Sequence, residues 1–264
     1  MIKRTLLLTL LSFFILISGC SKNETLSEQD KTQSAFDKFT NTVFLDTVTS
    51  NTINLHFTLA HPENYGITNA KVTLGDYGYD FFTEEYARTG EMLDSLLEFN
   101  YDLLTPSQQL TYDILEDALS SELANQNYIY FTEALSPLTG YQAQLPVLLA
   151  NYSFRNKTDI ENYLLLLDEF DEFFTKIMDF QKQKSEQGYF MPDFMAKDVI
   201  EQCEIFIDDI ENNYLIETFN STISKIDWLS ESEKTMYCEK NAQCIKEDVA
   251  NAYNIIIDGL NGLL

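Results

Sequence analysis

Residues 158–177, TDIENYLLLLDEFDEFFTKI, carry the clearest structural signal in the chain. From Ile160 onward, large apolar side chains recur at spacings of three and four residues, which is the period of one face of an α-helix. Thr158, with Glu161 three residues later, matches a capping box at a helix start. The acidic residues in the second half of the stretch are placed mostly toward water. We therefore predict one long amphipathic helix here.

Three further helices are predicted from their start signals. Thr105 before Pro106 is typical of an N-cap followed by the first helical position, and this helix should end near Leu123. A second helix should begin near Pro192, and a third at Ser230, which a glutamate follows at the third position. The buried face of the second is predicted to contain Val199, Cys203, Phe206, Ile210 and Tyr214, and that of the third Cys238, Ala242, Ile245, Val249, Ala252 and Ile256.

The remaining segments add two weaker helices and one strand. Residues 35–60 and 82–98 also have helical patterns, although β-branched residues crowd the first of them. The run NYIYFT at residues 127–132 is rich in strand-forming side chains, and the prolines and glycine between residues 137 and 146 indicate a loop after it. We predict a mainly α, multi-helix fold of long amphipathic helices with at most a small β-hairpin.

The first twenty residues match a bacterial lipoprotein signal peptide. Lys3 and Arg4 precede an apolar run from Thr5 to Ile17, and small residues then lead to Cys20. A run of about 13 apolar residues is too short to span a bilayer, so a cleaved signal is favoured over a transmembrane helix. We predict a signal peptide over residues 1–19, a lipidated Cys20 and a polar tether over residues 20–34. Acyl chains such as palmitate would hold the protein on the extracytoplasmic face of the cell membrane.

The chain is strongly acidic, with 42 acidic against 17 basic residues and a net charge of −25 at pH 7. Such a surface repels nucleic acid and anionic lipid headgroups, so no nucleic-acid partner is expected. Hydrophobic residues make up 45% of the sequence, which is enough for a packed core in a single helical domain over residues 35–264.

Three cysteines follow Cys20, and they lack the paired spacing of zinc sites. Cys238 and Cys244 are six residues apart, on different sides of one helix, so a disulfide would have to join Cys203 to one of them. The favoured alternative is that all three are small, buried apolar side chains without a disulfide.

No catalytic or metal-binding motif is recognisable. His56 and His61 are five residues apart, and Pro62 interrupts the helix that a zinc-peptidase motif needs. We interpret His56 as a hydrogen-bonded core or groove residue. Nucleophile elbows, P-loops and dinucleotide-binding glycine motifs are not found either. The sequence therefore predicts no catalytic residue, no metal ligand and no cofactor in this chain.

The C-terminal run from Asn254 to Leu264 is apolar and contains two glycines. Natural termini are more often polar and frayed. Either this run folds back onto the core, or the chain is the front part of a longer protein. We expect a domain truncated at its C-terminus.

Several blocks of the sequence, taken in order, carry a family resemblance. The opening block runs from Phe36 through His56 to HPENYGI at residues 61–67. The later blocks are Leu104-Thr105-Pro106 with Tyr112 and Leu115, Leu135-Ser136-Pro137 with Gly140, Gln144-Leu145-Pro146, Thr158-Asp159 with Tyr163, and Gly188. In order and spacing these blocks resemble the bacterial family called domain of unknown function 885 (DUF885), over nearly all of residues 35–264.

That resemblance implies a function for the chain. Members of the family are largely helical, commonly about twice as long, and similar to zinc metallopeptidases of the gluzincin type, with an H-E-x-x-H-like motif in the second half. The chain would be the N-terminal scaffold half of such a lipoprotein, inactive alone, with zinc only in a C-terminal half and peptides as substrates of the parent. Candidate residues for lining the substrate cleft are His56, His61, Tyr65, Tyr141 and Gln144.

Other interpretations remain open. A turn at residues 64–66 explains the opening block as well as a cleft does. The protein could also be a complete, non-catalytic lipoprotein that binds peptide, sugar or an envelope protein through an aromatic groove, since it has 15 tyrosines and 19 phenylalanines. A purely structural surface lipoprotein is the third possibility.

Overall fold

A computed structural model describes residues 26–264, and the structural statements below concern those residues. The predicted signal peptide, the lipidation of Cys20 and the first part of the tether lie outside them. Helices are the only regular secondary structure in the described part, which contains no strand, and this confirms the predicted mainly α fold. No helix within it has the length and apolar character needed to cross a membrane.

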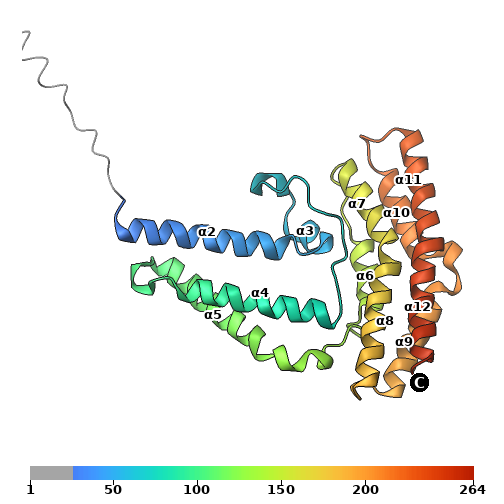
Figure 1. Ribbon diagram of the computed structural model, residues 1–264. Coiled ribbons are helices and arrows are strands. Elements are labelled where there is room, and N and C mark those ends of the chain that lie inside the picture. The colour runs from blue at the N-terminus through green and yellow to red at the C-terminus, as the bar shows by residue number, and fades with distance from the viewer. Residues whose placement is uncertain (1–25) are drawn as a thin grey trace, which may run out of the picture.

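The molecule consists of a helical arm and a larger helical bundle. In Figure 1 the arm extends to one side and the bundle stands upright. The arm contains the early helices and the bundle contains the later ones. The arm is made of α2 (Glu28–Val48), α3 (Thr52–Thr58), α4 (Tyr79–Leu97) and α5 (Pro106–Ala124). The bundle is made of α6 (Tyr141–Ala150), α7 (Lys157–Asp168), α8 (Phe170–Glu186), α9 (Asp193–Asp208), α10 (Tyr214–Ser224), α11 (Glu231–Cys244) and α12 (Ala250–Asn261).

Short helical turns connect these elements. They are η2 (Pro62–Tyr65), η3 (Tyr101–Leu103), η4 (Gln126–Phe131), η5 (Ile210–Asn212) and a π-helical turn, η6 (Ile245–Val249), which joins α11 to α12. Between η2 and α4 the chain runs without regular structure from the arm across to the bundle and back. This crossing segment, residues 67–78, is the part of the chain that shapes the candidate site below.

Each part has its own apolar core. The arm buries a small cluster of Phe36, Leu96, Leu104 and Tyr112. The bundle buries a much larger one, in which α12 packs between α8 and α9. Ile256, Ile257 and Leu260 of α12 are buried there, so the apolar C-terminal run packs onto the bundle core.

Most predicted helix starts are confirmed. Thr105 caps α5 and Ser230 caps α11, each through a capping box, and Pro192 immediately precedes α9. The helical patterns at residues 35–60 and 82–98 correspond to α2, α3 and α4. Ser27 caps α2, so residues 28–34, the second half of the predicted tether, are helical.

The predicted helix over residues 158–177 is instead two helices, and its predicted start is wrong. Asn156, rather than Thr158, is the N-cap of α7, and its side chain accepts a hydrogen bond from the Asp159 backbone N–H at 2.9 Å. The helix is interrupted at Glu169, whose carboxylate accepts a hydrogen bond from the backbone N–H of Leu74 at 2.9 Å. The break at Glu169 therefore ties the bundle to the crossing segment.

Two other local predictions are also wrong. Residues 127–131 lie in η4 and Thr132 caps it, instead of forming a strand. Their backbone hydrogen bonds are local, as from Tyr128 N–H to the Asn125 carbonyl at 2.8 Å. The predicted second helix ends at Asp208, and Tyr214, expected on its buried face, is exposed at the start of α10.

Pro146 lies inside α6 rather than in the predicted loop. A proline cannot donate to the carbonyl four residues earlier, which here belongs to Gln142. The buried Tyr253 hydroxyl of α12 donates to that carbonyl at 2.5 Å. A tertiary hydrogen bond therefore replaces the one that proline removes. The three described cysteines, Cys203, Cys238 and Cys244, are free thiols; Cys203 is buried as predicted, whereas Cys238 and Cys244 are half-buried.

Candidate functional site

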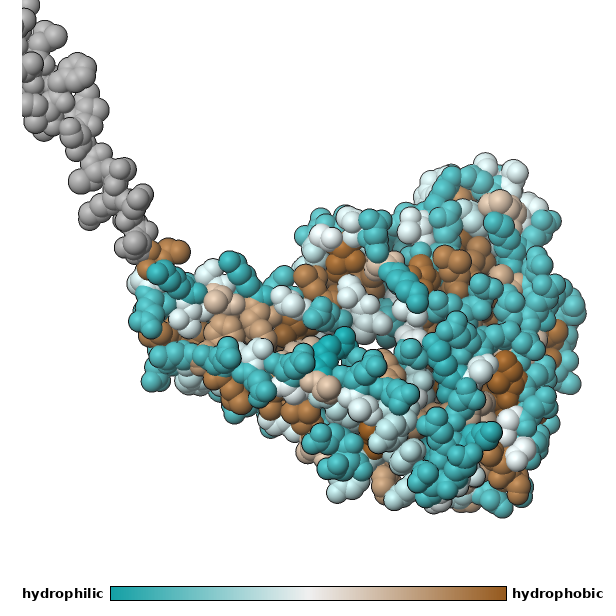
Figure 2. Space-filling model, in the orientation of Figure 1, coloured by the Kyte–Doolittle hydropathy of each residue, from teal (hydrophilic) through white to brown (hydrophobic). Residues whose placement is uncertain are grey.

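A cavity of about 660 Å³ lies where the arm meets the bundle. The surface in Figure 2 is hollowed between the two parts. We call this space the junction cavity. Its arm side is formed by the end of α2, by residues 49–51 and by α4, its bundle side by α8 and Tyr141 of α6, and residues 71–77 of the crossing segment cross between them.

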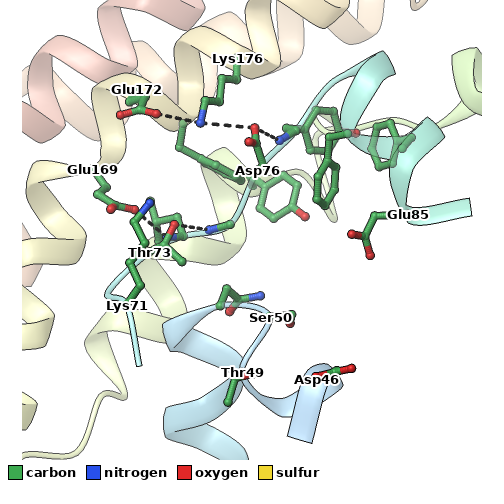
Figure 3. A pocket seen from close by; sticks show the side chains of 18 of the residues that line it. Asp46, Thr49, Ser50, Lys71, Thr73, Asp76, Glu85, Glu169, Glu172 and Lys176 are labelled. Carbon is green, nitrogen blue, oxygen red and sulfur yellow. Dashed lines mark hydrogen bonds and ion pairs between the residues drawn. The ribbon is translucent and has the colours of Figure 1, made fainter. Parts of the chain in front are cut away.

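Charged side chains of both signs line the junction cavity. Figure 3 shows Asp46, Thr49 and Ser50 on the arm side, and Glu169, Glu172 and Lys176 on the bundle side. Lys176 joins the crossing segment to α8, because its Nζ lies 2.8 Å from Glu172 and 3.3 Å from Asp76. These contacts lower the pKa of Glu172, through its hydrogen bond to Lys176, and raise the pKa of Lys176.

Lys71 differs from the other cations of the junction cavity. Arg88 pairs with Glu85, and Lys176 is paired twice. Among residues 26–264, no carboxylate lies within 4.0 Å of the Lys71 ammonium. Lys71 therefore presents to the junction cavity a positive charge without a direct ion pair, and its charge helps to lower the pKa of Glu172 in the same cavity.

An apolar side cavity of about 430 Å³ adjoins the junction cavity. The two cavities share Asn51, Leu74 and Tyr141, so Tyr141 stands at the boundary between them. Its ring packs edge-on against Phe173 and Tyr77, and burial raises the pKa of its hydroxyl. The side cavity is otherwise lined mainly by Ile53, Phe57, Gln144, Leu145 and Leu148 of α3 and α6.

The five residues predicted to line a cleft fall into separate places. Tyr141 and Gln144 line these cavities. His61 and Tyr65 lie at η2 on the exposed side of the arm, where His61 pairs with Glu63 and Tyr65 packs on Phe44. The role of all five in a cleft stays a prediction.

His56 is buried against the bundle and does not line the junction cavity. Its Nε2 accepts a hydrogen bond from Ser153 N–H at 3.1 Å, and its ring stacks on Tyr152 with centroids 3.5 Å apart. The Oδ1 atom of Asp159 lies 3.7 Å from His56 Nδ1. Burial raises the pKa of that carboxyl, but contacts with His56 and Arg155 outweigh burial, so its pKa lies below the ordinary value.

Sequence reasoning missed Lys71, Asp76 and Lys176. Charged residues are common in this chain, so none of them stands out alone. The glycines around them offered a signal, because Gly75 and Gly78 adopt φ values of 99° and 131° that other residues rarely adopt. Such closely spaced glycines indicate a tightly turning segment rather than an ordinary helix connection. Among the described residues, no three His, Cys, Asp or Glu side chains are grouped so as to hold a metal ion.

Comparisons with known proteins identify a family and a related structure. The family model described as "Bacterial protein of unknown function (DUF885)" matches residues 62–264. The crystal structure of "the putative lipoprotein from Colwellia psychrerythraea" superposes with a TM-score of 0.73 at 14% sequence identity. The match covers 90% of this chain and 42% of that one, so the chain spans less than half the length of its structural relative. The chain matches no curated protein. On the match over residues 62–264, the chain belongs to the DUF885 family of bacterial proteins.

Proposed function

We propose that this protein is a lipoprotein of the bacterial envelope, anchored through Cys20, whose helical domain binds peptides in the junction cavity. In this proposal the chain contributes the N-terminal, substrate-holding scaffold of a metallopeptidase-like protein and is inactive alone. The coverage of only 42% of the related structure supports a scaffold role within something longer. A complete, non-catalytic binding lipoprotein would use the same cavity.

The observation that carries the proposal is the pairing of a charged cavity with an apolar one. A peptide offers polar backbone groups and a carboxylate next to apolar side chains. Lys71 supplies an unpaired cation in the junction cavity, and the side cavity beyond Tyr141 has apolar walls. Ligand sites generally combine apolar walls with a few placed polar groups, and the two cavities have sizes typical of such sites.

Binding of a short peptide tests this proposal. The probe is the hexapeptide Ala-Ala-Leu-Ala-Ala-Glu with an N-terminal fluorescein, titrated with the full chain in detergent and followed by fluorescence anisotropy. We expect Lys71→Ala to weaken binding about fivefold to tenfold, because it removes the charge that faces the peptide carboxylates.

Lys197→Ala is the matched control, since Lys197 is an exposed lysine of α9 away from the cavity. This control should bind like the unchanged protein. Equal weakening by both lysine variants would point to non-specific charge effects and contradict a peptide site in the junction cavity. Absence of any binding by the unchanged protein would do the same.

Removing the predicted lipid attachment site should release the protein from the membrane. Cys20→Ala leaves no thiol for acylation at the predicted cleavage site. One or more acyl chains supply the membrane affinity, so we expect nearly all of the variant in the aqueous phase of a detergent phase separation. Radiolabelled palmitate should mark the unchanged protein only. Cys203→Ala, which removes a buried thiol, is the control and should stay labelled.

A further inference from the structure

Five aromatic side chains form a continuous strip where α4, η4 and the end of α8 meet. Starting from Tyr79, the ring centroids of Tyr130, Tyr189, Phe131 and Tyr128 follow at 5.3, 5.8, 5.1 and 5.9 Å. The rings of Tyr130 and Tyr189 are nearly parallel, at 4°. We call these residues the aromatic strip. Three segments far apart in sequence build it, so the fold rather than one local motif places the rings together.

The aromatic strip faces solvent. Tyr79, Tyr128, Phe131 and Tyr189 are between 40% and 66% exposed, and Tyr130 lies half-buried beneath them on Phe180. Single exposed aromatic residues are normal on protein surfaces, whereas contiguous exposed apolar patches mark interaction sites. Five contacting rings form such a contiguous patch, so the aromatic strip is a candidate interaction site.

A hollow of about 290 Å³ beside the aromatic strip is acidic. Its walls include Tyr79 of the strip together with Asp80, Glu84 and Asp179. Within the described residues none of these three carboxylates has a cationic side chain within 4.0 Å. Lys176, which also lines the hollow, is already paired with Glu172 and Asp76. The hollow thus carries negative charge that its own walls leave unpaired.

We propose that the aromatic strip and its acidic hollow form a docking surface for a basic polypeptide segment rich in lysine or arginine. Cations are attracted to the faces of tyrosine and phenylalanine rings, and carboxylates next to the rings strengthen that preference. Successive rings 5–6 Å apart extend beyond the reach of a single amine, which favours a chain of cationic side chains. The surface lies outside the junction cavity, apart from residues in the shared wall around Asp76 and Lys176.

Binding of matched peptides tests this surface. The probe is a fluorescein-labelled octapeptide of alternating Lys and Ala, compared with the analogue of alternating Glu and Ala and with the neutral sugar chitotetraose. The detergent-solubilised full chain should bind the lysine peptide in preference to both. We expect Phe131→Ala/Tyr189→Ala to weaken this binding roughly tenfold, since each exposed ring contributes about a two- to fivefold factor. Asp80→Asn/Asp179→Asn should weaken it about fivefold and reduce its salt dependence.

Two control variants separate the surface from general attraction to an acidic protein. Phe194→Ala/Trp228→Ala removes rings of equal exposure, 65% and 45%, outside the strip. Asp198→Asn/Asp208→Asn removes two exposed carboxylates of α9. Neither should change affinity for the lysine peptide by more than about twofold, and circular dichroism should show all four variants folded. Equal losses in test and control variants, equal binding of the glutamate peptide, or binding of chitotetraose alone would each overturn the proposal.

Discussion

Lys184→Ala is expected to lower the free energy of unfolding by about 3 kcal/mol. Lys184 is only 2% exposed, yet its ammonium donates to Glu133 at 2.6 Å and to the Thr132 carbonyl at 2.9 Å. Glu133 also accepts a hydrogen bond from the buried Gln181. Removing one partner of a buried ion pair leaves the other charge uncompensated, which costs about 3–5 kcal/mol. The lower end applies because the Glu133 side chain keeps 25% exposure.

Urea denaturation followed by circular dichroism measures this loss. Lys182→Ala is the control, because Lys182 lies two residues away on the same helix and is exposed. We expect its effect to stay below about 0.5 kcal/mol. Lys184→Met fills the same space without the charge, so it should also be destabilising while Glu133 remains ionised. An unfolding free energy for Lys184→Ala within about 0.5 kcal/mol of that for Lys182→Ala would show that the ion pair contributes little.

Local signals in the sequence were sufficient to predict a helix start wherever that start depends on a side chain three residues away. The capping boxes at Thr105 and Ser230 satisfy the first backbone N–H groups of α5 and α11 on their own, so their position is visible without the fold. The 3.6-residue period likewise gave the mainly α class, because it reflects one buried face per helix. These features needed no knowledge of what packs against each helix.

Features that depend on distant partners could not be predicted. The aromatic run in η4 resembled a strand, but Lys184 binds the Thr132 carbonyl immediately after it and holds it against α8. Pro146 resembled a loop residue, but Tyr253, more than a hundred residues later, compensates for its missing hydrogen bond. Both outcomes reflect tertiary contacts that override local propensity.

The candidate site could not be predicted from the sequence for the same reason. Its walls come from α2, α4, α6, α8 and the crossing segment, so no continuous stretch of sequence contains it. Tyr141 and Gln144 were chosen for a family resemblance; Tyr141 lies on the wall of the junction cavity and Gln144 on that of the adjoining side cavity. Lys71 and Lys176 were not identifiable among many charged residues. A site assembled between two parts of a molecule depends on how those parts are joined. The shape of the junction cavity therefore depends on the contact between arm and bundle.

Arg155→Ala should destabilise the protein by about 2–3 kcal/mol, because Arg155 is a principal link between arm and bundle. Its guanidinium donates to the carbonyls of His56, Leu59 and Ala60 at 2.8, 3.1 and 2.9 Å, near the C-terminal end of α3. A cation at this end of a helix is favourable, and hydrogen bonds from a charged donor contribute about 1.5–3 kcal/mol. The loss should appear as a lower urea midpoint, measured by circular dichroism.

Arg88→Ala is the matched control, since Arg88 is half-exposed on the arm and, among residues 26–264, forms an ion pair with Glu85 alone. Exposed pairs contribute about 0–1 kcal/mol, so its effect should be small. Arg155→Lys keeps the positive charge, but it should recover only part of the loss. One ammonium cannot bind three carbonyls in the geometry of a planar guanidinium. If Arg155→Ala and Arg88→Ala unfold at the same urea concentration, the arm is held by the crossing segment instead. A larger loss for Arg155→Ala would show that its hydrogen bonds to the carbonyls of His56, Leu59 and Ala60 hold the arm to the bundle.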